Sequence, residues 1–109
     1  MIRVFESQEG PLIILTVTGH AEHGDAPGHD IVCAGVSALY VALAESAAKD
    51  GALSEHLEGV DAKRLKLYPT RAARHYLSMF RTGLEALARE YPECVGKPGE
   101  KETAASDTL

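Results

Sequence analysis

The chain of 109 residues contains no tryptophan, few aromatic residues and only two cysteines. Aromatic residues make up 6% of the chain, which argues against the stacking platforms that bind single-stranded nucleic acid. Acidic residues outnumber basic ones, and the net charge of −5 argues against a general nucleic-acid binder. Two cysteines are too few for a disulfide scaffold. We therefore expect one globular domain of ordinary composition that makes no direct contact with nucleic acid.

Long apolar runs are also absent from the sequence. The first six residues lack the basic region and apolar run of a secretory signal. The longest apolar stretch, residues 12–15, is far shorter than a membrane span. We therefore expect a cytoplasmic protein that makes no contact with a membrane.

Charge is unevenly distributed along the chain. Residues 1–60 hold two basic and nine acidic residues, a net charge of −7, whereas residues 61–109 hold nine basic and seven acidic residues, a net charge of +2. An acidic surface built from the first half would favour a basic partner. A solvated acidic face without any partner explains the same pattern.

Apolar spacing and turn residues predict a single α+β domain over residues 1–96. We expect a small, mainly antiparallel sheet with two helices packed on one face. Residues 52–60 are expected to form an acidic connection, and residues 97–109 a disordered tail. The predicted order is β-β-α-β-α with a further edge strand at 93–95, from strands at 2–6, 12–18 and 63–68 and helices at 31–49 and 70–91.

Residues 20–30 are predicted to form a loop, because glycines and a proline interrupt any apolar spacing. His20 directly follows the second strand, where a rigid sheet would hold it. Asp30 is a plausible N-cap of the first helix, which makes Cys33 its third residue. The free N–H groups and the positive end of the helix dipole favour a thiolate there, although the Asp30 carboxylate partly opposes this.

The loop is long enough to bring the start of this helix back against the end of the strand. Cys33 and His20 would then meet, which is the arrangement that nucleophilic catalysis needs. Backbone N–H groups at the start of the helix could also bind an oxyanion.

Two other interpretations of these residues stay open on spacing alone. Cys33 is equally well explained as a small buried hydrophobe, with the histidines on the loop surface. His20, His23, His29 and Cys33 could instead supply nitrogen and sulfur ligands for zinc. No Cys-x-x-Cys pair and no standard ligand spacing supports such a site, so we expect no metal. Cys94 lies beside a helix-ending proline and is assigned no role.

The stretch from Gly19 to Ser37, GHAEHGDAPGHDIVCAGVS, resembles the signature of the ribosomal-processing cysteine protease family, Prp. That pattern is Gly-His-Ala, a short loop with glycine, then Asp-Ile-Val-Cys-Ala and a serine four residues after the cysteine. About twenty residues carry the resemblance directly. The predicted order of elements over residues 1–91 is also similar to the family's fold.

The resemblance implies that Cys33 is the nucleophile and His20 the general base of a cysteine endopeptidase. Asp30 and Ser37 would support this pair. Residues Gly24, Pro27 and Gly28 would belong to a lid loop that orders over bound substrate.

The family removes an N-terminal extension from large-subunit ribosomal protein twenty-seven during ribosome maturation. By resemblance we expect this substrate, a homodimer and no cofactor. A non-catalytic ribosome-associated binding module is the alternative function.

Overall fold

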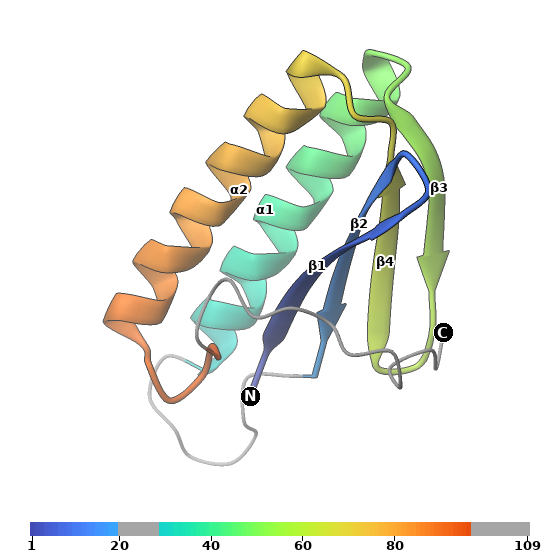
Figure 1. The fold of residues 1–109 in the computed structure, drawn as a ribbon. Coiled ribbons are helices and arrows are strands. Elements are labelled where there is room, and N and C mark those ends of the chain that lie inside the picture. The colour runs from blue at the N-terminus through green and yellow to red at the C-terminus, as the bar shows by residue number, and fades with distance from the viewer. Residues whose placement is uncertain (20–28, 97–109) are drawn as a thin grey trace.

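The structure is a computed structural model that describes residues 1–19 and 29–96 (Figure 1). Four strands form one antiparallel sheet in the order β1-β2-β4-β3. Both helices lie on the same face of this sheet, as predicted (Figure 1). The elements are β1 Arg3–Glu9, β2 Leu12–Thr18, α1 His29–Lys49, β3 Leu53–Glu58, β4 Ala62–Leu67 and α2 Arg71–Glu90.

β2 lies inside the sheet, between β1 and β4. Its apolar, β-branched sequence suits a strand buried on both faces. Leu15 faces the helices and is fully buried in the core. Ile14 and Thr16 point to the opposite face because side chains alternate along a strand, yet they are only 4% and 1% exposed. The Thr16 hydroxyl accepts a hydrogen bond of 3.0 Å from Arg64 Nε, which satisfies the buried hydroxyl.

The prediction of an acidic connection at residues 52–60 is wrong, because residues Leu53–Glu58 form the strand β3. It pairs with β4 at the edge of the sheet, and the Gly59 N–H donates a 2.7 Å hydrogen bond to the Ala62 carbonyl in the turn between them. The strand was missed because only Leu53 and Leu57 are half buried, so it has no clear apolar alternation. A register shift between Leu53 and Glu55 weakens the alternation further.

The ends of the helices confirm one predicted cap and correct another. Thr70 is the N-cap of α2, where its hydroxyl accepts a 3.0 Å hydrogen bond from the Ala73 N–H. α1 begins at His29, so Asp30 lies within the helix and not at its N-cap. Cys33 is consequently the fifth helical residue and not the third. Its own N–H therefore lies beyond the four free N–H groups that a helix start offers.

The predicted edge strand at residues 93–95 is reduced to a single parallel bridge between Ile2 and Val95. The Ile2 N–H donates to the Cys94 carbonyl at 2.8 Å, and the Gly96 N–H donates to the Ile2 carbonyl at 2.7 Å. Cys94 itself is only 2% exposed and belongs to the core. The predicted disordered tail, residues 97–109, lies outside the described residues.

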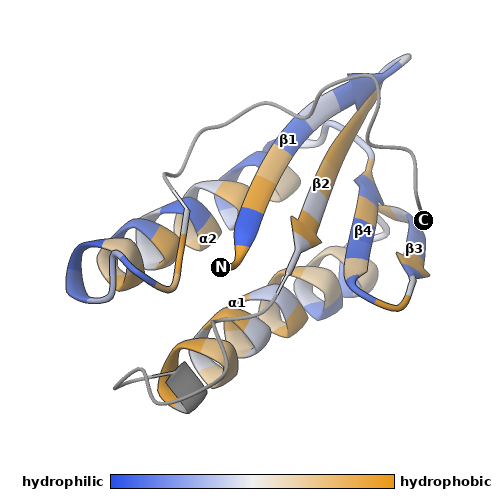
Figure 2. Ribbon diagram, turned by 90° about the horizontal axis from the view of Figure 1, so that it is seen from below, coloured by the Kyte–Doolittle hydropathy of each residue, from blue (hydrophilic) through white to orange (hydrophobic). Residues whose placement is uncertain are grey.

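The core lies between the sheet and the helices, which turn their apolar sides toward each other (Figure 2). α1 contributes Val32, Val36, Tyr40 and Leu43 to this core. The stretch Ile31–Lys49 is also long and apolar enough to cross a membrane by length and composition alone. A single such helix is weak evidence, because the core helix of a globular fold passes the same test.

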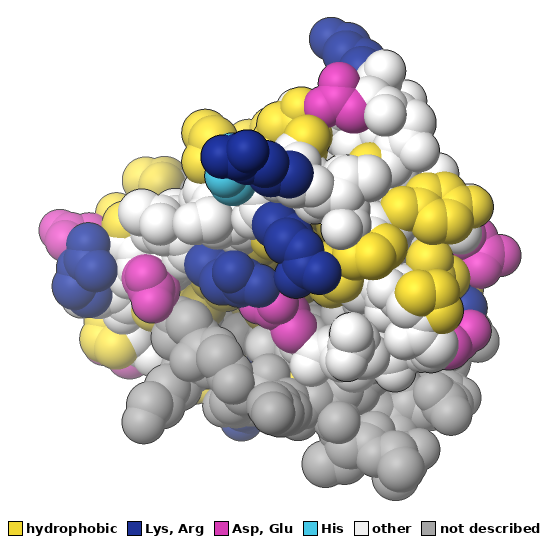
Figure 3. Space-filling view, turned by 45° about the horizontal axis from the view of Figure 1, so that its top comes forward, with side chains coloured by type: hydrophobic (Ala, Val, Ile, Leu, Met, Phe, Trp, Pro, Cys, Tyr) yellow, Lys and Arg dark blue, Asp and Glu magenta, His cyan; other side chains and the backbone are white. Residues whose placement is uncertain are grey.

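Ion pairs join the acidic first half of the chain to the basic second half. Arg81 of α2 donates to the Glu6 carboxylate at 2.5 and 2.6 Å, and Lys66 of β4 lies 3.2 Å from Glu9 and 3.6 Å from Glu55. The face in Figure 3 shows several Lys and Arg side chains near its centre, with Asp and Glu side chains lying singly among them. At these ion pairs, acidic residues of the first half of the chain therefore lie beside basic residues of the second half.

Candidate active site

Cys33 lies on the side of α1 that faces the sheet, one turn after the start of the helix. It is half buried, packs against the core and forms no disulfide. Val32 and Val36 are buried on either side of it, so α1 is held firmly against the sheet at this point. A rigid helix that presents a partly accessible thiol is suited to a nucleophile.

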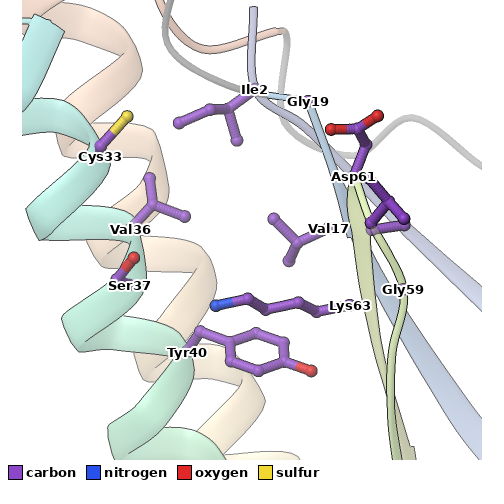
Figure 4. Close-up of a pocket in the computed structure, with 12 residues that line it drawn as sticks. Ile2, Val17, Gly19, Cys33, Val36, Ser37, Tyr40, Gly59, Asp61 and Lys63 are labelled. Carbon is purple, nitrogen blue, oxygen red and sulfur yellow. The ribbon is translucent and has the colours of Figure 1, made fainter.

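A cavity of about 260 Å³ opens beside Cys33, between α1 and one end of the sheet (Figure 4). The α1 wall carries Cys33, Ser37 and Tyr40, and the opposite wall comes from β2, β4 and the turn between β3 and β4. Apolar side chains line most of the space, and polar groups stand at intervals along it. The lining residues are Ile2, Val17, Gly19, Cys33, Val36, Ser37, Tyr40, Gly59, Val60, Asp61, Ala62 and Lys63.

Gly19 fixes the point at which the chain leaves β2 beside this cavity. Its φ of +79° lies in the left-handed region that favours glycine. The Gly19 N–H donates a 3.1 Å hydrogen bond to the Asp61 carbonyl. A Cβ at this position would collide with the Met1 carbonyl oxygen, so the backbone just before β1 packs closely against the residue. Gly19 therefore stands on the wall of the cavity opposite Cys33 (Figure 4).

The structure places some of the predicted site residues and leaves others outside its description. Cys33 and the exposed Ser37 line the same cavity, four residues apart on one side of α1. The predicted general base His20 and the predicted lid residues Gly24, Pro27 and Gly28 lie outside the described residues. The side chain of Asp30, the other predicted supporting residue, is likewise outside the description.

The zinc interpretation gains no support from the described part of the chain. Of its four candidate ligands, only Cys33 has a described side chain. Within residues 1–19 and 29–96, the described side chains include no group of three or more His, Cys, Asp or Glu residues that could hold a metal ion.

Tyr40 and Lys63 line the cavity but were not predicted as site residues. For both residues, the spacing of apolar residues in the sequence could have predicted that the side chain faces the space between helix and sheet. Lys63 lies two and four residues before Leu65 and Leu67 on the same strand, so its side chain points to the same face as theirs, toward the helices. Tyr40 lies four residues after Val36 on the buried side of the helix. Asp61 gave no such signal, because its place depends on β3, which was not predicted.

Tyr40 lies among charged and aromatic groups at the inner end of the cavity. The Lys63 ammonium is 5.6 Å from the centroid of the Tyr40 ring, within cation–π range. The His56 ring is tilted by 52° against the Tyr40 ring, with the two centroids 5.9 Å apart. Burial, and to a lesser degree the Glu58 carboxylate, raise the pKa of Tyr40 above its ordinary range. Tyr40 therefore stays a neutral hydrogen-bond donor at physiological pH.

Comparison with known proteins decides the family of this chain. The model of the family described as cysteine protease Prp matches residues 1–96. The chain belongs to the Prp family of cysteine proteases. The Prp resemblance drawn from Gly19 to Ser37 is confirmed, and the protein is a cysteine protease. No curated protein sequence matches the chain.

Solved structures show the same fold. Two structures of the essential ribosomal processing protease Prp from S. aureus, one with a substrate peptide and one with a covalently linked product peptide, match with a TM-score of 0.71 at 23% identity. Each match covers 88% of this chain and 96% of the S. aureus chain. SMU.848 from Streptococcus mutans matches with a TM-score of 0.66 at 27% identity, over 88% of this chain and 90% of the other. The predicted α+β class, with both helices on one face of the sheet, is thus confirmed with β3 added.

Proposed function

We propose that this Prp-family protease removes the N-terminal extension of large-subunit ribosomal protein twenty-seven, with Cys33 as nucleophile and His20 as general base. The observation that carries the proposal is the position of Cys33 within the Gly19-to-Ser37 motif and on the wall of the cavity. Gly19, which precedes His20 in the sequence, lines the same cavity as Cys33.

The proposed reaction proceeds through an acyl-enzyme. His20 takes the Cys33 proton, and the thiolate sulfur attacks the carbonyl carbon of the scissile peptide bond. The tetrahedral intermediate collapses as the carbon–nitrogen bond breaks and His20 protonates the leaving amine. Water, deprotonated by His20, then attacks the thioester, which releases the carboxylic acid and restores the thiol. Asp30 and Ser37 support the pair, and no cofactor takes part.

The substrate proposal is supported by the S. aureus relatives, which are ribosomal processing proteases crystallised with substrate and product peptides. We propose that the protein works in the cytoplasm, where ribosomes mature, and as a homodimer. The outward side of α1 offers a surface for the second copy, because Ile31 is 62% exposed and is followed on that side by exposed Ala34, Ala38 and Ala42.

The first test uses a synthetic peptide that spans the junction between the extension and the mature ribosomal protein of the source organism. Mass spectrometry should find one cut at that junction with the parent protein. Cys33→Ala and His20→Ala should each reduce kcat/KM by at least about a thousandfold, because removing one member of such a pair removes its joint effect.

Cys94→Ala is the matched control, because it removes the other thiol, which lies in the core and away from the cavity. It should cleave the peptide at close to the parent rate. Cleavage that survives Cys33→Ala or His20→Ala would overturn the proposed mechanism. Tight binding of the peptide without any cleavage by the parent would favour the non-catalytic binding module.

A further inference from the structure

The outward side of α2 carries a row of arginines. Residues three or four apart share one side of a helix, and this spacing repeats on α2 from Arg71 to Arg89. All residues of this side are exposed, and they include four of the six arginines of the chain. We call this side the α2 stripe: Arg71, Arg74, His75, Ser78, Arg81, Thr82, Glu85 and Arg89. Four arginines and one glutamate give it a charge of +3 with His75 neutral, whereas the whole chain has a net charge of −5.

Ion pairs within the chain do not explain most of these arginines. Arg81 is paired with Glu6. The side chains of Arg71, Arg74 and Arg89 make no ion pair or hydrogen bond in the part of the chain that the structure describes. Arg71 and Arg74 also lie in the first turn of α2, which has no acidic residue, and the positive end of the helix dipole disfavours cations there. Their placement therefore does not serve the stability of the helix.

The composition of the α2 stripe favours a polyanion over a protein or a membrane surface. Its eight residues include no apolar side chain. A protein interface has an apolar core, and a helix that lies on a membrane inserts apolar side chains. Guanidinium groups, in contrast, bind phosphate through two parallel N–H bonds. The stripe is about 27 Å long at 1.5 Å of rise per residue, which is long enough to reach several phosphates of one backbone.

The α2 stripe is separate from the candidate active site. None of its residues lines the cavity beside Cys33, whose walls come from α1 and the sheet. A partner that binds along the outward side of α2 therefore leaves this cavity open to a peptide.

We propose that the α2 stripe binds the phosphate backbone of RNA. The inference goes beyond the proposed function, which concerns a peptide in the cavity, and only the choice of RNA rests on that function, because a ribosomal protein assembles with ribosomal RNA. The expectation of no contact with nucleic acid came from the net charge, which averages over the whole chain and does not describe one side of α2. Since phosphates carry no sequence information, binding should depend on salt and not on base sequence.

The test measures binding of a fluorescein-labelled RNA hairpin by fluorescence anisotropy. The association constant of the parent should fall about 40-fold between about 50 mM and about 200 mM potassium chloride, as expected if about three phosphates are neutralised. One variant that combines Arg71→Gln, Arg74→Gln and Arg89→Gln should bind at least about tenfold more weakly at the lower salt and lose most of the salt dependence. Glutamine has a high helix propensity, so thermal unfolding followed by circular dichroism should match that of the parent.

The matched control combines Lys49→Gln, Lys97→Gln and Lys101→Gln, which removes the same charge outside α2. It should bind the hairpin within about twofold of the parent. Equal losses in the two triple variants would mean that only net charge matters and would overturn the inference, as would no binding by the parent at the lower salt.

Two further measurements separate RNA binding from the proposed function and from another partner. Cys33→Ala should bind the hairpin as the parent does, so the result holds even if the proposed nucleophile is wrong. Unlabelled RNA should displace the hairpin at a far lower concentration than polyglutamate. Equal displacement by polyglutamate would overturn the choice of RNA and favour an acidic protein partner.

Discussion

Gly19 shows how a single residue shapes the approach to the cavity. Its positive φ and the Met1 carbonyl beside it leave room for a hydrogen atom but not for a methyl group. The Gly19 N–H donates a hydrogen bond to the Asp61 carbonyl and so connects the end of β2 to the turn between β3 and β4. The glycine of the Gly-His-Ala motif therefore has a steric reason that is independent of catalysis.

Gly19→Ala should lower the free energy of unfolding by about 2–4 kcal/mol. About 1–2 kcal/mol of this comes from the left-handed backbone, and the rest from the collision with Met1. Gly51→Ala is the matched control, because Gly51 has a similar φ of +71° but open space around it. It should lose only the backbone part. Urea unfolding of the two variants measures the difference, and equal losses would contradict the steric argument.

The helices and strands of the fold differ in how well they could be predicted from their sequences. β2 and α2 were predicted because an apolar run or a regular apolar stripe survives in each, and Thr70 was readable as an N-cap. β3 was not readable, because an exposed edge strand needs little apolar surface and its bulge breaks the alternation. The motif supplied Cys33 and Ser37, whereas Asp61 required the β3–β4 pairing that tertiary structure alone provides.

The cap of α2 allows an independent test at the scale of one element. Thr70→Ala should lower the free energy of unfolding by about 1 kcal/mol, because the Ala73 N–H loses its acceptor. Thr70→Ser keeps a hydroxyl in the same place and should stay within about 0.5 kcal/mol of the parent. Thermal unfolding followed by circular dichroism measures both variants. An equal loss in Thr70→Ser would show that the methyl group, and not the cap, carries the effect.

Charge acts over the whole molecule and is distributed differently in space than along the chain. Glu6, Glu9 and Glu55 are paired with Arg81 and Lys66, so they contribute little field at a distance. The acids that line the second cavity along α1, of about 290 Å³, are a separate set. They are Glu45 and Glu58, and Lys63 lines the same cavity. This cavity thus combines a local cation with acidic side chains.

This arrangement predicts how salt affects cleavage of a basic ribosomal substrate. Long-range attraction by Glu45 and Glu58 is screened as the Debye length falls from about 10 Å at 0.1 M salt to about 3 Å at 1 M, so KM should rise several-fold. Bond cleavage occurs at Cys33 after the substrate is seated, so kcat should change less than twofold. Steady-state kinetics on the intact ribosomal protein, with potassium chloride varied, measures both constants. A peptide with its basic residues replaced by glutamine is the control and should show a flat KM. If KM for the intact substrate is also flat, Glu45 and Glu58 do not attract it, and recognition depends on close contacts alone.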